Sequence, residues 1–148
     1  STAGGTPVPP IKDGKTKVKS VQLIFNVVTN GSHVWMRQRP TTGIWGGLWE
    51  FPSRELPLGL ALPEQPPTAA GILPGALRSK TLWGEPFEHV LSHRRLRCQF
   101  VIWHVTEAPS PTEGCWMPWN EAELKARPRA VDRCWEGLEK SCLALGNR

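Results

Sequence analysis

The sequence lacks several features that would point to common classes of protein. No apolar run approaches the ~18 residues that a membrane-spanning helix needs, so we expect no membrane association. The first residues, STAGGTPVPP, contain no apolar core of a secretory signal. This favours an intracellular location, in the cytoplasm or nucleoid or in a eukaryotic nucleus. The four cysteines show neither CxxC spacing nor zinc-like intervals with histidine, so we expect reduced thiols rather than a metal site.

Tyrosine is absent, whereas tryptophan occurs eight times. Most of these indoles are expected to pack in or around the core, and one or two could stack on bases. The 148 residues suit one domain, and 39% hydrophobic with 21% charged residues argue for a folded chain. Residues 1–19 are rich in Gly, Pro and Lys and predict a linker or basic arm, so the domain itself is expected over 20–148.

Positive charge is concentrated in two places. The formal net charge is +5, and residues 12–39 hold six Lys or Arg against the single Asp13. The second group consists of Arg94, Arg95 and Arg97. Such clustering suits a polyanion such as nucleic acid, and on charge alone a solvated basic surface explains it as well.

The first half of the domain predicts strands and a glycine-rich loop. Residues 20–29 form an almost continuous apolar run, which is typical of a central strand. An Asn-Gly pair at 30–31 predicts a hairpin, because both residues tolerate positive φ, and 33–39 is the predicted return strand. Residues 41–52 predict a loop whose glycines frame tryptophan packing, with a short strand at 48–51.

The second half predicts a long β-hairpin. Residues 54–78 contain several prolines and allow only a short, broken helix, for which 68–71 is the predicted start. Two strands at 80–90 and 95–106 flank the tripeptide Leu91-Ser92-His93. That tripeptide therefore lies at a chain reversal next to three arginines.

The C-terminal part predicts one more strand and then helices. After a strand at 115–119, Asn120 is the predicted N-cap of a helix, with Glu123 in the capping-box position. Apolar residues from Val131 to Leu145 recur at helical spacing and predict a last helix whose apolar stripe packs on the sheet. The order of elements predicts an α/β or α+β sandwich, a mixed β-sheet flanked by helices.

Two segments resemble the C-terminal domain of the MutY-type adenine DNA glycosylases: RQRPTTGIWGGLWEFPS at residues 37–53 and FEHVLSHRRL at residues 87–96. The resemblance extends in order over roughly residues 20–140. It implies a MutT-like (Nudix) sandwich that recognises 8-oxoguanine opposite adenine in duplex DNA for base excision repair. It also implies that a separate N-terminal domain with a 4Fe–4S cluster excises the adenine, and this sequence shows no signature of that domain.

The resemblance implies a recognition domain with no catalytic residue, cofactor or metal of its own. Its expected partners are double-stranded DNA with an 8-oxoguanine:adenine pair, the N-terminal catalytic domain of the same protein, and repair or clamp proteins bound through the linker. Two other functions stay open: a Nudix nucleotide pyrophosphohydrolase and a protein-interaction module that uses the basic arm. A hydrolase needs several carboxylates on one helix to hold Mg²⁺. The segment that follows the glycine-rich loop, residues 54–75, offers only Glu55 and Glu64, which are separated by prolines.

Leu91, Ser92 and His93 match the family's recognition loop. Oxidation turns the N7 of guanine from an acceptor into an N–H donor. The Ser92 hydroxyl would distinguish the two bases if its own proton were committed to a phosphate or a backbone carbonyl, because only a lone pair would then face N7. His93 is assigned to the same triplet, and a purely turn-forming role is the alternative for both residues.

Leu91 stands where the family usually has Phe, and it could wedge between base steps or pack inward. Arg94 and Arg95 follow the loop directly and are the predicted DNA phosphate contacts, which would position the protein without specifying sequence.

Overall fold

Strand β1 runs through the middle of the sheet and explains the long apolar run near the start of the domain. The computed structural model describes residues 19–146, so the predicted basic arm lies, apart from Lys19, outside the described residues. β1 (Lys19–Thr29) pairs in parallel with β6 and antiparallel with β4. Its alternate residues enter two cores on opposite faces: Phe25 belongs to the first core and Ile24 to the second. The prediction of a central strand is confirmed.

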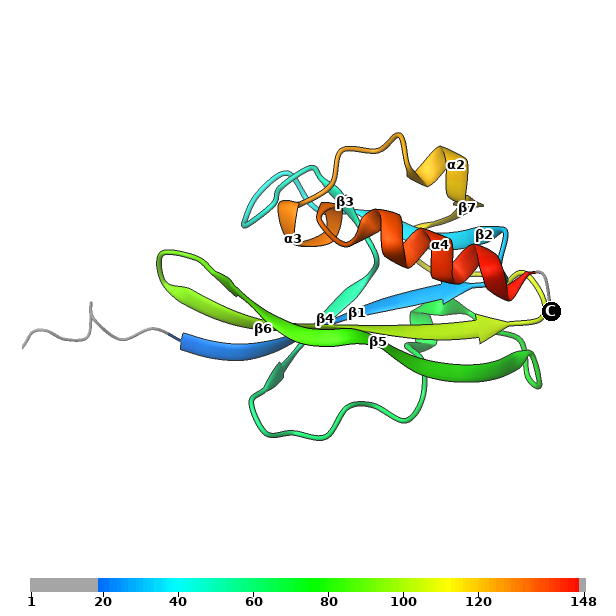
Figure 1. Cartoon of the computed structure of the whole chain (residues 1–148), viewed down its shortest axis with the longest axis horizontal. Helices are drawn as coiled ribbons and strands as arrows, with labels where there is room; N and C mark the ends of the chain where they lie inside the picture. The colour runs from blue at the N-terminus through cyan, green and yellow to red at the C-terminus, as the bar shows by residue number, and fades with distance from the viewer. Residues whose placement is uncertain (1–18, 147–148) are drawn as a thin grey trace, which may run out of the picture.

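The described residues form a seven-stranded mixed sheet with the order β3-β2-β1-β6-β5, in which β4 pairs with β1 and β7 with β2 (Figure 1). The further elements are β2 (His33–Gln38), β3 (Trp49–Glu50), β4 (Ser53–Pro57), a 3-10 helix η1 (Thr68–Ala70), β5 (Leu77–Val90), β6 (Arg94–Val105), β7 (Cys115–Pro118), α2 (Trp119–Ala122), α3 (Arg129–Asp132) and α4 (Trp135–Leu145).

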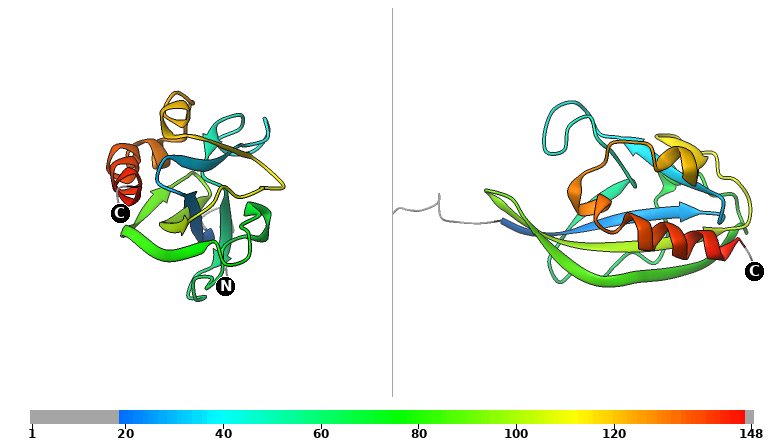
Figure 2. Two further views of the ribbon diagram at one scale, coloured as in Figure 1. Left: turned by 90° about the vertical axis from the view of Figure 1, so that its right-hand side faces the viewer. Right: turned by 45° about the horizontal axis from the view of Figure 1, so that its top comes forward.

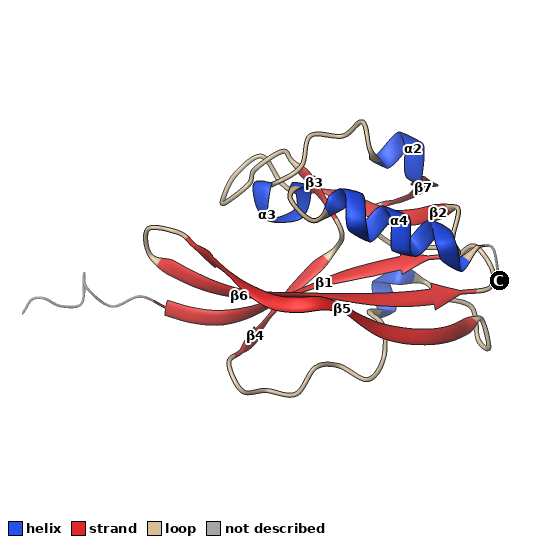
Figure 3. Ribbon diagram, in the orientation of Figure 1, coloured by secondary structure: helices blue, strands red, loops and turns tan. Residues whose placement is uncertain are grey.

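Helical segments cover both faces of the sheet, which gives the α+β arrangement that the sequence predicted (Figure 3). The apolar side of α4 contributes Leu138 and Cys142 to the first core, and the ring of Trp135 stacks on Phe51 with centroids 5.3 Å apart. On the other face, η1 contributes Ala70 to the second core. The prediction of a short helix at 68–71 is therefore confirmed.

In the turn after β1, only one residue of the Asn-Gly pair adopts the positive φ that both residues tolerate. Gly31 has a φ of 105°, whereas Asn30 keeps a negative φ and instead accepts backbone hydrogen bonds from Ser32 and His33 through its side-chain oxygen. β2 pairs with β1 only at Thr29 and Val34 and then diverges toward β7 and β3. The hairpin is short because β2 leaves β1 for these other partners.

Two predictions about the C-terminal helices are wrong. Asn120 is not the N-cap, because α2 begins one residue earlier, after Pro118, without a side-chain cap hydrogen bond. The start of that helix is fixed instead by Trp119, which is buried and donates its indole N–H to the Thr29 hydroxyl at 3.2 Å. Val131 belongs to α3 rather than to the last helix, although it is buried in the same core as α4.

The β5–β6 hairpin extends from one end of the molecule, beyond the helices, and its tip lies beside the start of β1 (Figures 1 and 2). The two strands pair along most of their length, with irregular register between Trp83 and Phe87. Within residues 19–146, no helix has the length and apolar character required to cross a membrane.

Candidate nucleic-acid interface

The hairpin tip presents two polar side chains to solvent. The Leu91 N–H donates to the Arg94 carbonyl at 2.7 Å, and the Arg94 N–H donates back to the Leu91 carbonyl at 3.3 Å. These bonds close a two-residue turn made of Ser92 and His93, both of which are exposed. The structure therefore places the two predicted polar recognition residues side by side at the end of a projecting hairpin.

The Ser92 hydroxyl makes no hydrogen bond with any protein group in the described part of the chain. The predicted backbone carbonyl partner is therefore not found. The nearby carbonyls instead accept backbone N–H groups: those of Leu91 and Arg94 accept each other's N–H, and that of His93 accepts the Lys19 N–H at 3.3 Å. A phosphate remains the partner that the discrimination hypothesis needs.

Leu91 is half-buried and packs against the first core, on the same side as Trp45 and Phe87. Of the two roles considered for Leu91, this conformation shows the inward one. His89, two residues before it on the same face, lies with its ring centroid 5.3 Å from that of Trp45. Partial burial, together with the nearby positive charge of Arg133, lowers the pKa of His89 below its ordinary value of 6.5.

Arg94 and Arg95 face opposite sides of β6 and have different surroundings. Arg94 forms a 2.5 Å ion pair with Glu55 of β4, and its side chain is 25% exposed. Arg95 is 51% exposed and lies 3.8 Å from Glu88 of β5, which is a loose surface pair. Of the two predicted phosphate contacts, Arg95 is available to an incoming anion, whereas Arg94 already has a close carboxylate partner.

A buried carboxylate near the glycine-rich loop was missed by the sequence analysis. Glu50 is fully buried, and its Oε2 accepts hydrogen bonds from Arg39 at 2.7 Å, Arg37 at 3.1 Å and the Ser53 hydroxyl at 3.3 Å. The cluster joins β2, β3 and β4. A signal existed in the sequence, because alternation along the predicted strand at 33–39 puts Arg37 and Arg39 on one face and so predicts a shared partner.

The loop before β3 carries a strained residue. Trp45 is the only non-glycine residue among those described with a positive φ, at 57°. A Cβ at Gly46 would lie 2.5 Å from the Thr41 carbonyl oxygen, so the loop closes on itself only with glycine there. Arg39 approaches the Trp45 ring at 5.7 Å. The prediction that these glycines serve loop packing agrees with this geometry.

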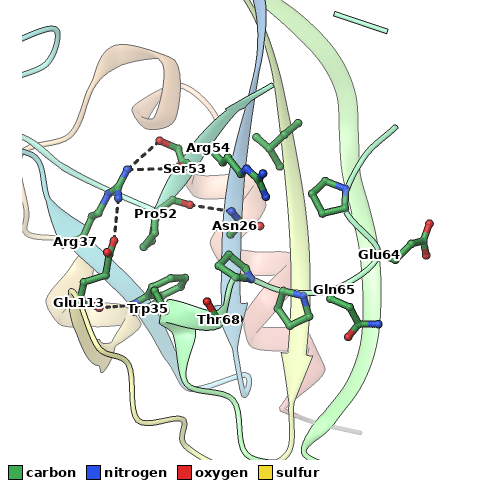
Figure 4. A pocket seen from close by; sticks show the side chains of 15 residues that line it. Asn26, Trp35, Arg37, Pro52, Ser53, Arg54, Glu64, Gln65, Thr68 and Glu113 are labelled. Carbon is green, nitrogen blue, oxygen red and sulfur yellow. Dashed lines mark hydrogen bonds and ion pairs between the residues drawn. The ribbon is translucent and has the colours of Figure 1, made fainter. Parts of the chain in front are cut away.

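A cavity with a volume of about 560 Å³ lies away from the hairpin tip (Figure 4). Prolines of the segment before η1 form one wall, and Trp35, Arg37, Ser53 and Glu113 line the other. The Arg37 guanidinium is bound to the Glu113 carboxylate at 3.0 Å, and the indole N–H of Trp35 donates to the Glu113 carbonyl at 2.8 Å. The polar groups of this wall thus mostly bind one another.

The comparison with protein families decides the class of this domain. A family model described as a NUDIX domain matches residues 24–137. The chain belongs to the Nudix domain family.

Solved structures show that this Nudix fold serves different functions. A chain in the complex between the C-terminal domain of mouse MUTYH and human PCNA is 24% identical, with a TM-score of 0.64 over 82% of this chain and 88% of that one. MutT, from a study of Aliivibrio salmonicida and Vibrio cholerae, is 18% identical, with a TM-score of 0.55 over 85% and 98%. The Nudix hydrolase RenU of M. smegmatis is 16% identical, with a TM-score of 0.58 over 92% and 93%. At these identities the likeness establishes the fold, and function must be argued from the site.

The described carboxylates of this Nudix domain do not form a divalent-metal site. Between β4 and β5 the described helical structure is the three-residue η1, which is too short to present several carboxylates on one face. Glu55 is paired with Arg94, and the side chain of Glu64 is 89% exposed with Lys80 at 4.0 Å. In residues 19–146 no group of three or more His, Cys, Asp or Glu could hold a metal ion. The residues present therefore do not fit a Mg²⁺ ion that would bind a diphosphate.

Proposed function

We propose that this Nudix domain reads 8-oxoguanine opposite adenine in duplex DNA, as the C-terminal recognition domain of an adenine DNA glycosylase. One observation carries the proposal: Ser92 lies exposed at the tip of a projecting hairpin, with a hydroxyl that no described protein group engages. Its position within a segment that resembles the MutY-type recognition loop supports the same role.

The chemistry of discrimination follows from the hydroxyl. A phosphate cannot donate a hydrogen bond, so a Ser92 hydroxyl that donates to phosphate turns a lone pair toward the base. 8-Oxoguanine offers an N7–H to that lone pair, whereas guanine offers a second lone pair. A polar group left unpaired in such a contact costs about 1–3 kcal/mol, which is about a ten- to hundredfold loss of affinity.

The excision itself is assigned to a separate domain of the same protein. In this proposal that N-terminal domain carries the 4Fe–4S cluster and the catalytic residues, and the present chain contributes binding and recognition. A sliding clamp is a further candidate partner, because the structural relative from mouse MUTYH was solved in complex with PCNA.

The alternative function is a nucleotide pyrophosphohydrolase, which the Nudix fold and the 560 Å³ cavity favour. The dispersed carboxylates argue against it, since Glu50 is held by two arginines and Glu55 by a third. Mg²⁺-dependent release of pyrophosphate from 8-oxo-dGTP by this chain would support the hydrolase instead.

The test is a titration of the chain with duplexes that carry adenine opposite either 8-oxoguanine or guanine. The wild type should prefer the lesion about ten- to hundredfold, and Ser92→Ala should remove most of that preference. Ser79→Ala is the matched control, because Ser79 is also exposed but lies at the far end of β5. An equal loss of affinity for both duplexes in Ser92→Ala would contradict the recognition role.

A further inference from the structure

The arginines near the hairpin tip differ in whether a carboxylate already neutralises them. Arg94 and Arg95 have Glu55 and Glu88 as partners. Arg97 and Arg133 are both exposed, and neither has an acidic ion-pair partner among the described residues. Arg95 has only the loose pair with Glu88, and the arginines of this hairpin region with no carboxylate partner among the described residues are Arg97 and Arg133.

Arg133, the residue directly after α3, reaches the hairpin from a distant part of the sequence. Its guanidinium lies over the Phe87 ring of β5 at 4.9 Å from the centroid. The neighbouring Asp132 does not neutralise it, because that carboxylate is bound to Arg127 at 2.7 Å. Stacking on an aromatic ring orders the guanidinium without consuming its charge, so Arg133 stays available to an anion.

Arg97 lies on the opposite face of the same hairpin. Its neighbours in β6, Leu96 and Cys98, are buried in the first core, so alternation turns Arg97 outward on the other side. In the ladder it stands between Gln22 of β1 and Glu88 of β5. Glu88 makes its ion pair with Arg95, at 3.8 Å.

The two faces can be assigned from the register of the hairpin. Phe87 is directly opposite Cys98, and both belong to the first core, whereas Glu88 is directly opposite Arg97. Arg133, stacked on Phe87, is therefore on the first-core face, and Arg97 is on the other. Both Phe87 and Arg97 are five positions from Ser92, which is about 16 Å along a strand at ~3.3 Å per residue.

This spacing is about twice the depth of a DNA groove. With the tip at the floor of a groove about 8 Å deep, the phosphates at its rim lie roughly 8 Å ahead of these positions. An extended arginine side chain with its hydrogen bond to phosphate covers such a gap, so Arg97 can reach a rim phosphate directly. Arg133 would do so by moving its guanidinium from the Phe87 ring toward the phosphate, on the other side of the tip.

We propose that Arg97 and Arg133 contact phosphates on opposite sides of the nucleotide at the hairpin tip, so that the hairpin is held between the two DNA backbones. The inference rests on the proposed function, since it takes duplex DNA as the ligand. It assigns the main phosphate contacts to one residue of β6 and one beside α3.

The salt dependence of DNA binding tests this assignment. Each lost phosphate contact should lower the slope of log affinity against log salt by about 0.9, so R97Q and R133Q should each lower it by that amount and the double variant by about 1.8. R97K and R133K should keep most of the slope, because lysine binds phosphate as a point charge. R78Q is the matched control, since Arg78 is exposed and has no acidic partner in the described part of the chain, but lies fourteen positions from Ser92 in the sequence.

The outcomes separate this inference from the proposed function. If R78Q lowers the slope as much as R97Q and R133Q, binding is diffuse and the assignment is wrong. If neither variant changes the slope while Ser92→Ala still removes lesion preference, the assignment is wrong and the proposed function stands. If both variants lower the slope but lesion and guanine duplexes bind alike, the assignment stands and the proposed function fails. If the wild type binds no duplex, both are wrong.

Discussion

Removing the carboxylate of Glu55 should strengthen the binding of this domain to DNA. In the wild type the 2.5 Å ion pair commits Arg94 to Glu55. The variant Glu55→Gln keeps the shape of the side chain and removes its charge, which leaves Arg94 next to the tip with no carboxylate partner. We expect Arg94 then to contact a phosphate.

The magnitude follows from one additional phosphate contact. The magnitude of the slope of log affinity against log salt should rise by about 0.9. Between 0.05 and 0.2 M salt, the affinity of the variant should therefore fall by an additional factor of about 3.5 compared with the wild type. The cost in stability should be small. The Glu55 and Arg94 side chains are 45% and 25% exposed, and a pair that solvent reaches in this way contributes at most about 1 kcal/mol. The Tm should therefore fall by roughly 4 °C or less.

The assay is fluorescence anisotropy with a labelled duplex over a range of salt concentrations. Glu107→Gln is the matched control, because it removes the same charge just beyond the other end of β6, about 40 Å from Arg94 by strand rise and several Debye lengths away. The reasoning is refuted if Glu55→Gln leaves the slope unchanged while R94Q in the wild-type background lowers it by about 0.9. That result would mean that Arg94 contacts phosphate despite Glu55.

Three further predictions concern stability and reactivity. Gly31→Ala should lower the free energy of unfolding by more than about 1 kcal/mol in urea denaturation, because φ is 105° and a Cβ would lie 2.6 Å from the backbone after α4; Gly43→Ala, with φ of 85° and open space, should cost less. The folded-state pKa of His89 lies below 6.5, so the folded state favours the neutral ring. The stability that this ring contributes should be complete above pH 6.5 and be lost as the pH falls from 6.5 through the folded-state pKa, and His89→Gln should remove this pH dependence. Burial raises the pKa of Cys142 to about 12, so a thiol reagent at pH 8 should label the exposed Cys115 first and Cys142 only after unfolding, as peptide mass mapping would show.

Local patterns in the sequence predicted the strands and helices that show an apolar run or an apolar face in their own residues. The apolar run of β1 and the helical spacing of Leu138 and Cys142 fixed which sides face the cores. The reversal at residues 91–93 was predicted because two strand-like runs flank it. The N-cap at Asn120 failed because a local capping preference, worth about 1 kcal/mol, is weaker than the burial of an indole such as Trp119.

The charge pairing at the candidate interface could not be predicted from the sequence. Arg94 meets Glu55 only because β4 and β6 lie on either side of β1, and nothing in the spacing of the two residues indicates that topology. The position of Arg133 over Phe87 depends in the same way on how α3 packs on the hairpin. Clusters of basic residues in a sequence show where cations are, and only the packing shows which of them stay free.

The parallel pairing of β1 with β6 determines where a neighbouring domain would be attached. Lys19, the first residue of β1, stands next to Arg94, and its N–H donates to the His93 carbonyl at 3.3 Å. Any upstream domain is therefore tethered at the same end of the sheet as the hairpin tip with Ser92 and His93, not at the opposite end. The length of the linker, rather than the width of this domain, would then set the distance between the sites to which the two domains bind. A change in linker length would change the effective concentration of the upstream domain at DNA bound by this domain.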